Sequence, residues 1–216
     1  MNRLPRKAKH PLRLSPLLRN LVVVVAVALA LSLTACTTVV RVPATAAPTP
    51  TATADLSSPL GELTMTAPKT LDGLPRIPNS QLDSVASKLK ANYGPVISSV
   101  FYAAYGRGAA PSLLFMGMTS TQPLGPEGGS VTGPYLDGIL NGFNNSSGQH
   151  LSTADAIQKT VKGHGYTCFP ITLNAMALGM CLWIDSNVLG VVIDVRGESL
   201  DQVAELADNA RKAAQS

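Results

Sequence analysis

Residues 21–33 are thirteen uncharged and mainly apolar residues that directly follow a basic stretch. The first twenty residues carry six Lys or Arg and no acidic residue. A basic stretch, a short apolar core and small residues before a cleavage point are typical of a secretory signal peptide. We therefore assign residues 1–35 to a signal peptide or membrane anchor. This leader limits the fold most, because it predicts a globular part that folds outside the cytoplasmic membrane.

The leader ends on residues 33–36 (LTAC), which resemble the lipobox of bacterial lipoproteins. In those proteins the cysteine thiol receives a diacylglycerol group and becomes the new N-terminus. The resemblance implies that Cys36 is lipidated, and acyl chains hold a protein on the membrane with about 0.8 kcal/mol per buried CH₂. An uncleaved transmembrane helix over residues 21–40 is the alternative, since these twenty residues carry no charge. Both predict a protein anchored in the cell membrane that faces the extracytoplasmic side.

The formal net charge of +4 could indicate nucleic-acid binding, but the positions of the charges argue against it. Without the leader, residues 36–216 hold 11 basic and 13 acidic residues. A folded part with this balance offers no basic face to phosphates. We therefore expect no nucleic-acid partner.

Residues 36–70 differ in composition from the rest of the chain. The 34 residues from 37 to 70 include nine Thr, six Ala and five Pro. Such a segment buries too little apolar surface to offset its chain entropy. We expect an extended linker here, either a plain spacer or a stalk glycosylated on Thr. The globular domain is then expected over residues 71–216.

The pattern of residues 71–216 predicts an α+β domain with a mainly antiparallel sheet of about five strands. Apolar and β-branched runs bounded by turn residues indicate the strands. The expected strands cover residues 95–105, 112–119, 166–172, 178–185 and 188–195.

Helices are expected to flank this sheet at both ends of the domain. Spacing of apolar residues predicts a helix over 80–90, with Ser80 as its cap, and a short helix over 134–143. The last helix begins with a capping box, in which Ser199 precedes Gln202 by three residues. Residues 151–162, in contrast, fit either a helix or a strand.

Two cysteines remain once Cys36 is assigned to the lipid, and an even pair in an exported domain predicts a disulfide. If a hairpin turns on Asn174 and Ala175, Cys168 lies directly opposite Cys181. This pair falls on a non-hydrogen-bonded position, where Cα atoms approach to about 4.5 Å. A redox-active pair is the alternative, but thirteen residues of separation lack the C-x-x-C geometry that lowers a thiol pKa. We therefore expect a structural disulfide.

Two further residues refine the expected hairpin. Pro170 has no N–H that could donate a hydrogen bond to a second neighbouring strand. Residues 166–172 are therefore predicted to be an edge strand. Trp183 shares a strand face with Cys181 and Asp185, so we expect its ring to pack over the disulfide.

Candidates for chemistry are few. His150 and His164 are fourteen residues apart with no adjacent cluster of Asp, Glu or Cys, which makes a poor metal site, and His164 has the context of a turn. Asp185 and Asp194 follow or end strands and could share acid–base work. Residues 185–187 (DSN), however, have the composition of a hairpin turn. We therefore predict no catalytic, cofactor-binding or metal-ligating residue.

From residue 181 onward (CLWIDSNVLGVV) the chain resembles a widespread group of uncharacterised actinobacterial envelope proteins. In that group a C-x-W-x-D…G-V strand pair follows a C-x-P sequence, matched by residues 168–170, and precedes a helix with an Arg, matched by Arg211. The resemblance covers about residues 95–214. It implies a membrane-anchored extracytoplasmic domain and no particular activity.

These features predict a membrane-anchored lipoprotein that works as a non-enzymatic binding or interaction module of the cell envelope. Its expected partners are the membrane, through the lipid, and an envelope protein, lipid or cell-wall component. One alternative is a carrier of an apolar envelope molecule, which needs a sizeable apolar cavity between helices and sheet. Another is a small envelope hydrolase, which needs His150 or His164 beside a serine or a carboxylate.

Overall fold

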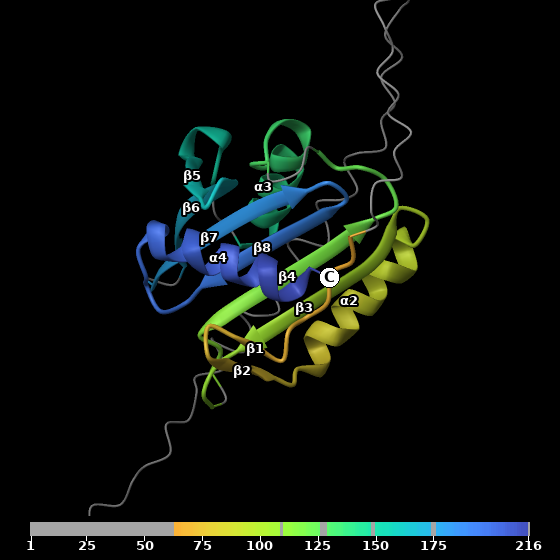
Figure 1. Cartoon of the computed structure of the whole chain (residues 1–216), viewed down its shortest axis with the longest axis horizontal. Coiled ribbons are helices and arrows are strands. Elements are labelled where there is room, and N and C mark those ends of the chain that lie inside the picture. The colour runs from red at the N-terminus through yellow and green to blue at the C-terminus, as the bar shows by residue number, and fades with distance from the viewer. Residues whose placement is uncertain (1–62, 109, 126–128, 148–149, 174–175, 216) are drawn as a thin grey trace, which may run out of the picture.

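An antiparallel sheet of eight strands forms the centre of the molecule (Figure 1). The computed structural model describes residues 63–108, 110–125, 129–147, 150–173 and 176–215. The strands are β1 (Thr70–Leu71), β2 (Leu74–Ile77), β3 (Ile97–Tyr105), β4 (Leu113–Ser120), β5 (Ile157–Val161), β6 (His164–Leu173), β7 (Met176–Asp185) and β8 (Val188–Asp194). They lie in the order β1-β2-β3-β4-β8-β7-β6-β5, so two groups of four successive strands meet where β4 pairs with β8.

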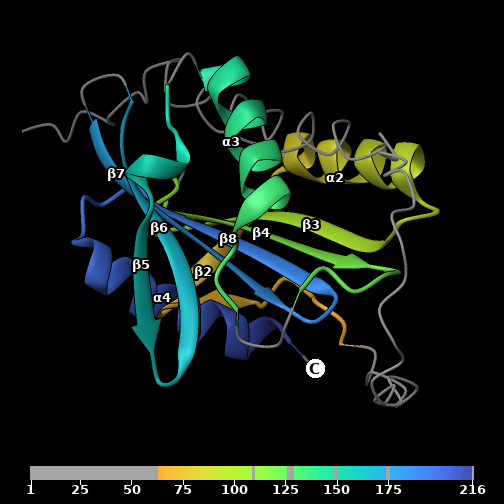
Figure 2. The ribbon, with the colours of Figure 1, turned by 90° about the horizontal axis from the view of Figure 1, so that it is seen from above.

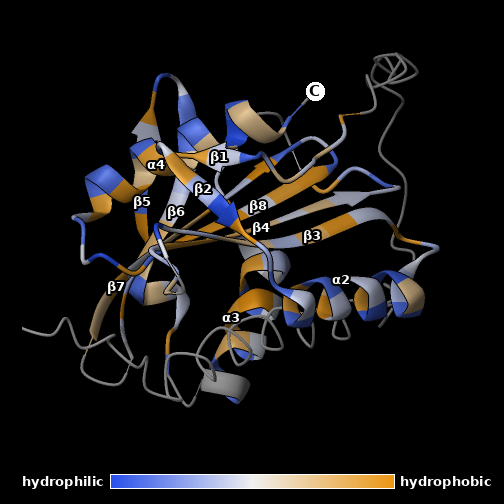
Figure 3. Cartoon of the chain, turned by 90° about the horizontal axis from the view of Figure 1, so that it is seen from below, coloured by the Kyte–Doolittle hydropathy of each residue, from blue (hydrophilic) through white to orange (hydrophobic). Residues whose placement is uncertain are grey.

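Three α-helices cover both faces of this sheet. Figure 2 shows α2 (Ser80–Tyr93) and α3 (Gly133–Ser147) on one face and α4 (Leu200–Ala214) on the other. A short 3₁₀ helix, η2 (Thr153–Asp155), precedes β5. Because helices cover both faces, every residue from 178 to 194, in β7, β8 and the turn between them, is buried. The sequences of β7 and β8 are therefore mainly apolar and do not alternate with polar residues. The hydropathy colours in Figure 3 show these apolar central strands, in contrast to the hydrophilic outer side of α2.

The α+β class, the antiparallel sheet and the flanking helices are confirmed, whereas the expected strand number was too low. Two of the additional strands, β1 and β2, are too short to show an alternating pattern. The third, β5, lies in the segment that fitted either a helix or a strand, and there the strand follows η2.

The prediction that residues 166–172 form an edge strand is wrong. β5 pairs with β6 on the side away from β7, which places β6 inside the sheet. The β5 ladder begins at Ile157, opposite Cys168, so it does not reach Pro170. The missing N–H of Pro170 therefore costs no hydrogen bond to β5, and a short neighbour is enough to accommodate the proline.

Helix starts are set by side-chain caps, one of which differs from the expectation. The cap of α2 is Asn79 and not Ser80, because the Asn79 side chain accepts hydrogen bonds from the backbone N–H groups of Gln81 (3.1 Å) and Leu82 (3.2 Å). The expected capping box of α4, formed by Ser199 and Gln202, is present.

Residues 63–68, which we call the strap, run across the α4 face of the sheet before β1. The Leu63 carbonyl accepts a hydrogen bond from Asn187 Nδ2 (3.2 Å), and the Met65 N–H donates to Thr119 Oγ1 (3.1 Å). Met65 is buried, and its side chain lies against Gly117. The sequence assigned the strap to the linker, but here it packs on the domain.

None of the helices in the described residues is long and apolar enough to cross a membrane. The expected signal peptide and Cys36 lie outside the described residues, as do Asn174 and Ala175 of the expected hairpin turn.

Candidate functional site

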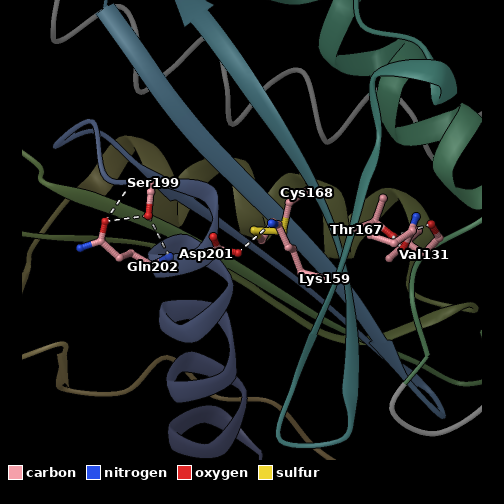
Figure 4. Close-up of a disulfide and its surroundings, with 9 residues drawn as sticks. Val131, Lys159, Thr167, Cys168, Ser199, Asp201 and Gln202 are labelled. Atoms are coloured by element: carbon pink, nitrogen blue, oxygen red, sulfur yellow. Dashed lines mark hydrogen bonds and ion pairs between the residues drawn. A yellow bond between two sulfur atoms is a disulfide. The ribbon is translucent and has the colours of Figure 1, made fainter.

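The predicted disulfide joins Cys168 of β6 to Cys181 of β7. The two residues are direct cross-strand partners with Cα atoms 4.1 Å apart, as the expected register requires. Both cysteines are completely buried beneath α4. Figure 4 shows the surroundings of the disulfide, where Lys159 of β5 forms an ion pair with Asp201 of α4. The distance from Lys159 Nζ to Asp201 Oδ1 is 2.7 Å. A thiol pair sealed in this way has a structural role.

Trp183 lies in the same apolar cluster as the disulfide. Its cross-strand partner is Gly190, and a Cβ at that position would overlap the indole ring. The ring centroids of Phe115 (5.9 Å) and Tyr166 (6.1 Å) lie beside it. Gly190 therefore leaves room for the indole ring to lie flat on β8. This accounts for the glycine that stands opposite the tryptophan in the C-x-W-x-D…G-V strand pair.

A network of buried charges ties α4 to the sheet. Asp208 is completely buried, and its Oδ1 accepts hydrogen bonds from the Tyr166 hydroxyl (3.0 Å) and from Arg211 Nη2 (3.2 Å). Its second oxygen accepts from Lys212 Nζ (2.6 Å) and lies 3.6 Å from Lys162 Nζ. Three hydrogen bonds and a fourth, longer ion pair therefore compensate the charge of this carboxylate.

Arg211 extends the network to β7. Its Nη1 donates to Asp185 Oδ2 (3.4 Å) and to Gln215 Oε1 (3.5 Å), and its Nε donates to the Tyr166 hydroxyl (3.3 Å). The fold thus brings together Asp185 and Arg211, two residues that the family resemblance singled out separately. Since the guanidinium donors are all engaged, we interpret this network as a structural lock.

The pH dependence of stability tests the lock. Burial alone would raise the pKa of Asp208, but hydrogen bonds from Lys212, Tyr166 and Arg211 outweigh it and lower the pKa from 3.8 to about 2. Because the folded-state pKa is depressed, the contribution of about 2 kcal/mol is present above pH 5 and is lost as the pH falls toward 2. Urea unfolding at pH 7, 4 and 2.5 measures this loss.

Asp208→Asn is the control for this prediction. The variant cannot titrate at this position, so its free energy of unfolding should change less between pH 5 and 2.5 than that of the wild-type chain. Identical pH slopes for the two proteins would contradict the assigned role of Asp208.

The two carboxylates that could share acid–base work, Asp185 and Asp194, lie apart, whereas Asp185 and His164 both contact Arg211. Asp185 pairs with Val188 at the β7–β8 turn, whereas Asp194 lies at the opposite end of that hairpin. His164 Nδ1 lies 3.2 Å from the Lys162 carbonyl and 3.3 Å from Arg211 Nη2, and it starts β6 after the turn. His150 is exposed. Within the described ranges, no group of three or more His, Cys, Asp or Glu could hold a metal ion.

An open polar hollow of about 190 Å³ lies near Asp194, at the end of the sheet opposite the β7–β8 turn. It is formed by the β1–β2 turn, the segment after β8 and the first turns of α4. Its polar walls come from Asp72, Arg196, Glu198, Gln202, Glu205 and Asn209. We take this hollow as the candidate binding site.

Arg196 fixes the base of the hollow. Its Nε donates to Asp194 Oδ1 (2.6 Å), and its Nη1 donates to Asp72 Oδ2 (2.8 Å). Asp194 is completely buried and also accepts hydrogen bonds from the N–H groups of Arg196 and Glu198, each at 3.0 Å. Sequence reasoning missed this site, because Asp72 and Arg196 lie 124 residues apart and neither belongs to a motif.

A second unusual feature is the hydroxyl of Tyr102 on β3. It is buried among apolar residues between the sheet and the helices α2 and α3, and burial raises its pKa above the ordinary value. Within the described part of the chain this hydroxyl has no hydrogen-bond partner. Three methionines, Met116, Met118 and Met180, belong to the same cluster. Methionine side chains are flexible and adapt to irregular shapes.

Replacing Tyr102 by phenylalanine tests whether its hydroxyl is unsatisfied. We expect Tyr102→Phe to leave the free energy of unfolding unchanged or to raise it by about 1 kcal/mol, because a buried hydroxyl without a partner is costly. Tyr105→Phe is the matched control on the same strand. Its hydroxyl donates to the Pro68 carbonyl (2.9 Å), so its removal should lower stability by about 1 kcal/mol. Equal losses in the two variants would contradict the assignment.

Comparison with known proteins adds nothing to this geometry: no family model, no curated protein and no solved structure matches the chain.

Proposed function

We propose that this protein is a membrane-anchored extracytoplasmic lipoprotein that works as a non-enzymatic binding module of the cell envelope. The anchor in this proposal is the lipid on Cys36, followed by a linker that carries the domain away from the membrane. The hollow next to Arg196 is the binding site. Its walls offer carboxylate and amide groups that suit recognition of a polar partner.

The position of the hollow relative to the strap supports this proposal most. The strap joins the domain beside Thr119 and Asn187, at the last residues of β4 and at the β7–β8 turn. The hollow lies next to Asp194, which pairs with Leu113 at the first residue of β4. At about 3.4 Å per residue, the length of β4 separates the two ends by roughly 20–25 Å. A domain held by its linker at one end would present the hollow at the other.

The anchor is tested by membrane fractionation of cells that express the full chain or the Cys36→Ser variant. We expect the wild-type protein in the membrane fraction with an acyl mass on its N-terminal cysteine, and the variant without that mass. A wild-type protein that stays in the membrane with its intact leader and without an acyl mass would favour the transmembrane alternative. A wild-type protein without acyl chain or leader would overturn the proposed anchor.

The binding role is tested by site-specific photocrosslinking in intact cells. A photoreactive side chain is placed in the hollow at Asn209 and, as a control, at the exposed Gln122 on the strap end of the domain. We expect a discrete adduct with one envelope component from position 209 and none from position 122. No adduct from position 209, or the same adducts from both positions, would contradict a binding site at the hollow.

A carrier of an apolar envelope molecule is the second candidate, and the unpartnered hydroxyl of Tyr102 favours it. A ligand with one hydrogen-bond acceptor on an apolar body would complement this hydroxyl among the methionines. Native mass spectrometry of the chain extracted in mild detergent is the test. A discrete non-covalent mass that is lost in Tyr102→Phe would support the carrier, and a bare acylated polypeptide would argue against it.

A further inference from the structure

We infer that the apolar layer between the sheet and the helices α2 and α3 binds a neutral long-chain molecule whose carbonyl accepts a hydrogen bond from Tyr102. A long-chain acyl ester is a molecule of this class. The inference rests on the carrier function, the second candidate above, and assigns the position of its site and the chemistry of its ligand. It does not involve the hollow.

The hydroxyl of Tyr102 differs from those of the other buried tyrosines. On the opposite face of the sheet, the Tyr105 hydroxyl donates to the Pro68 carbonyl (2.9 Å), and the Tyr166 hydroxyl donates to Asp208 (3.0 Å). Tyr102 is only 5% exposed, and its hydroxyl has no partner in the described residues. A buried hydroxyl without a partner lowers stability, and phenylalanine would avoid this cost. A tyrosine at this position therefore points to a hydrogen-bond partner that the described residues do not supply.

Two other buried hydroxyls on the same face of the sheet are satisfied within the chain. Thr167 Oγ1 donates to the Val131 carbonyl (2.9 Å), and Ser120 Oγ donates to the Val96 carbonyl (3.2 Å). The apolar layer around Tyr102 thus offers one free polar group to a ligand. A single hydrogen bond fixes the position of an otherwise apolar molecule.

The surroundings of Tyr102 exclude a charged ligand group. The buried charged residues of the described chain all lie in the structural lock or beside Arg196, on the α4 side: Asp185, Asp194, Asp208 and Arg211. A charge placed at Tyr102 would lose its water without gaining a counter-ion. Burial also raises the pKa of Tyr102, so the phenol keeps its proton and donates it. The ligand therefore contributes a neutral acceptor, such as the carbonyl of an ester or a ketone.

Methionine side chains line the path from Tyr102 across the sheet. Met116 of β4 lies directly opposite Tyr102, and Met118 follows it on the same face. Met180 of β7 belongs to the same cluster. Unbranched thioether side chains adapt to irregular apolar shapes, so they can repack around an inserted chain. This lining suits a long flexible ligand.

Helix α3 is the part of the cover that can move aside. It lies beside α2 on this face of the sheet (Figure 2). Gly138 and Gly142 are buried in its interior, and each lowers helix propensity by about 1 kcal/mol relative to alanine. The Asn144 side chain ties the helix to the backbone of Leu151 in the segment that follows it. The α3 side chains in the layer are apolar, so an apolar ligand can replace their contacts: Leu136, Ile139, Leu140 and Phe143.

Photolabelling of the full chain, extracted in mild detergent, tests the inference. One probe is a photoreactive analogue of methyl palmitate, and the matched probe is a photoreactive analogue of hexadecane, which lacks the carbonyl. We expect the ester probe to label β3, β4 or α3 and to label them more strongly than the alkane probe does. Adducts that depend on light are located by mass spectrometry of peptides.

Tyr102→Phe is the test variant and Tyr105→Phe the matched control on the same strand. Labelling by the ester probe should fall about fivefold or more in Tyr102→Phe, because one hydrogen bond is lost, and should stay unchanged in Tyr105→Phe. The alkane probe should label the wild-type chain and Tyr102→Phe equally. Equal ester labelling of the wild-type chain and Tyr102→Phe, or adducts confined to the α4 face, would overturn the assigned site.

Native mass spectrometry separates this inference from the carrier function. A bound mass that persists in Tyr102→Phe would keep a carrier and overturn the site at Tyr102. A bare acylated polypeptide together with failed ester labelling would overturn both. The binding role of the hollow is tested separately, by the adduct from position 209.

Discussion

Replacing Arg211 by methionine is expected to lower the free energy of unfolding by about 3–5 kcal/mol. The guanidinium is largely buried and donates to Asp208, Asp185 and Tyr166, which belong to three different elements. Methionine keeps much of the side-chain volume but leaves two buried carboxylates without this cation. Removing one partner of a buried charge pair costs more than the pair contributes, because the remaining charge has been taken out of water.

Urea unfolding at pH 7, followed by tryptophan fluorescence, measures this change, because Trp183 is the only tryptophan and is buried under α4. Lys212→Met is the matched control on the same helix. Lys212 also binds Asp208, but about half of its side chain is exposed, so its removal should cost about 1 kcal/mol or less. A loss below 1 kcal/mol for Arg211→Met would show that the network does not hold α4 on the sheet.

Removing the disulfide is the second large perturbation. The Cys168→Ala, Cys181→Ala double variant is expected to be less stable by about 3 kcal/mol, since the crosslink closes a loop across thirteen positions and restricts the unfolded chain. The two half-cystines are completely buried, so loss of sulfur packing adds to this entropic effect.

A reducing agent supplies the control for the disulfide. Reduction should bring the unfolding free energy of the wild-type chain close to that of the double variant, which itself should not respond to the reductant. Cys36 is present in both proteins, so it does not distinguish them. A wild-type chain whose stability is unaffected by complete reduction, verified by thiol labelling in urea, would contradict the prediction.

Local features could be predicted from the sequence where a residue type in a given context has a single structural role. The Cys168–Cys181 pairing followed from a two-residue turn and the alternation of an antiparallel ladder, and it is confirmed. The capping box of α4 was also recognisable, because Ser199 and Gln202 satisfy each other's backbone N–H groups. Such signals depend only on residues close in sequence.

Long-range arrangement was predicted less well. The edge position of residues 166–172 rested on Pro170, but β5 pairs only with the half of β6 that lies before the proline. The sequence of β5 alternates weakly, because only one face of this outermost strand is partly covered by α4. A strand of this kind is defined by its neighbours and not by its own pattern.

The hollow could not be predicted from the sequence for a related reason. Its polar residues come from the β1–β2 turn, the segment after β8 and α4, and each has the local context of an ordinary surface residue. Only the pairing of Arg196 with Asp194 and Asp72 brings them together. Arg211, in contrast, was named by the family resemblance, but its partners Asp208 and Tyr166 were not predicted from the sequence.

The strand order has a consequence for how the chain folds. All neighbouring strands in the sheet are also successive in sequence, except β4 and β8, where Leu113 pairs with Asp194. Closing so long a loop costs chain entropy before any contact compensates for it, so we expect this pairing to be the slow step of folding. Until β8 emerges, the apolar strand β4 has an open edge, and such edges recruit other chains. The interval between the synthesis of β4 and its pairing with β8 is therefore the period in which a new molecule most needs protection from aggregation.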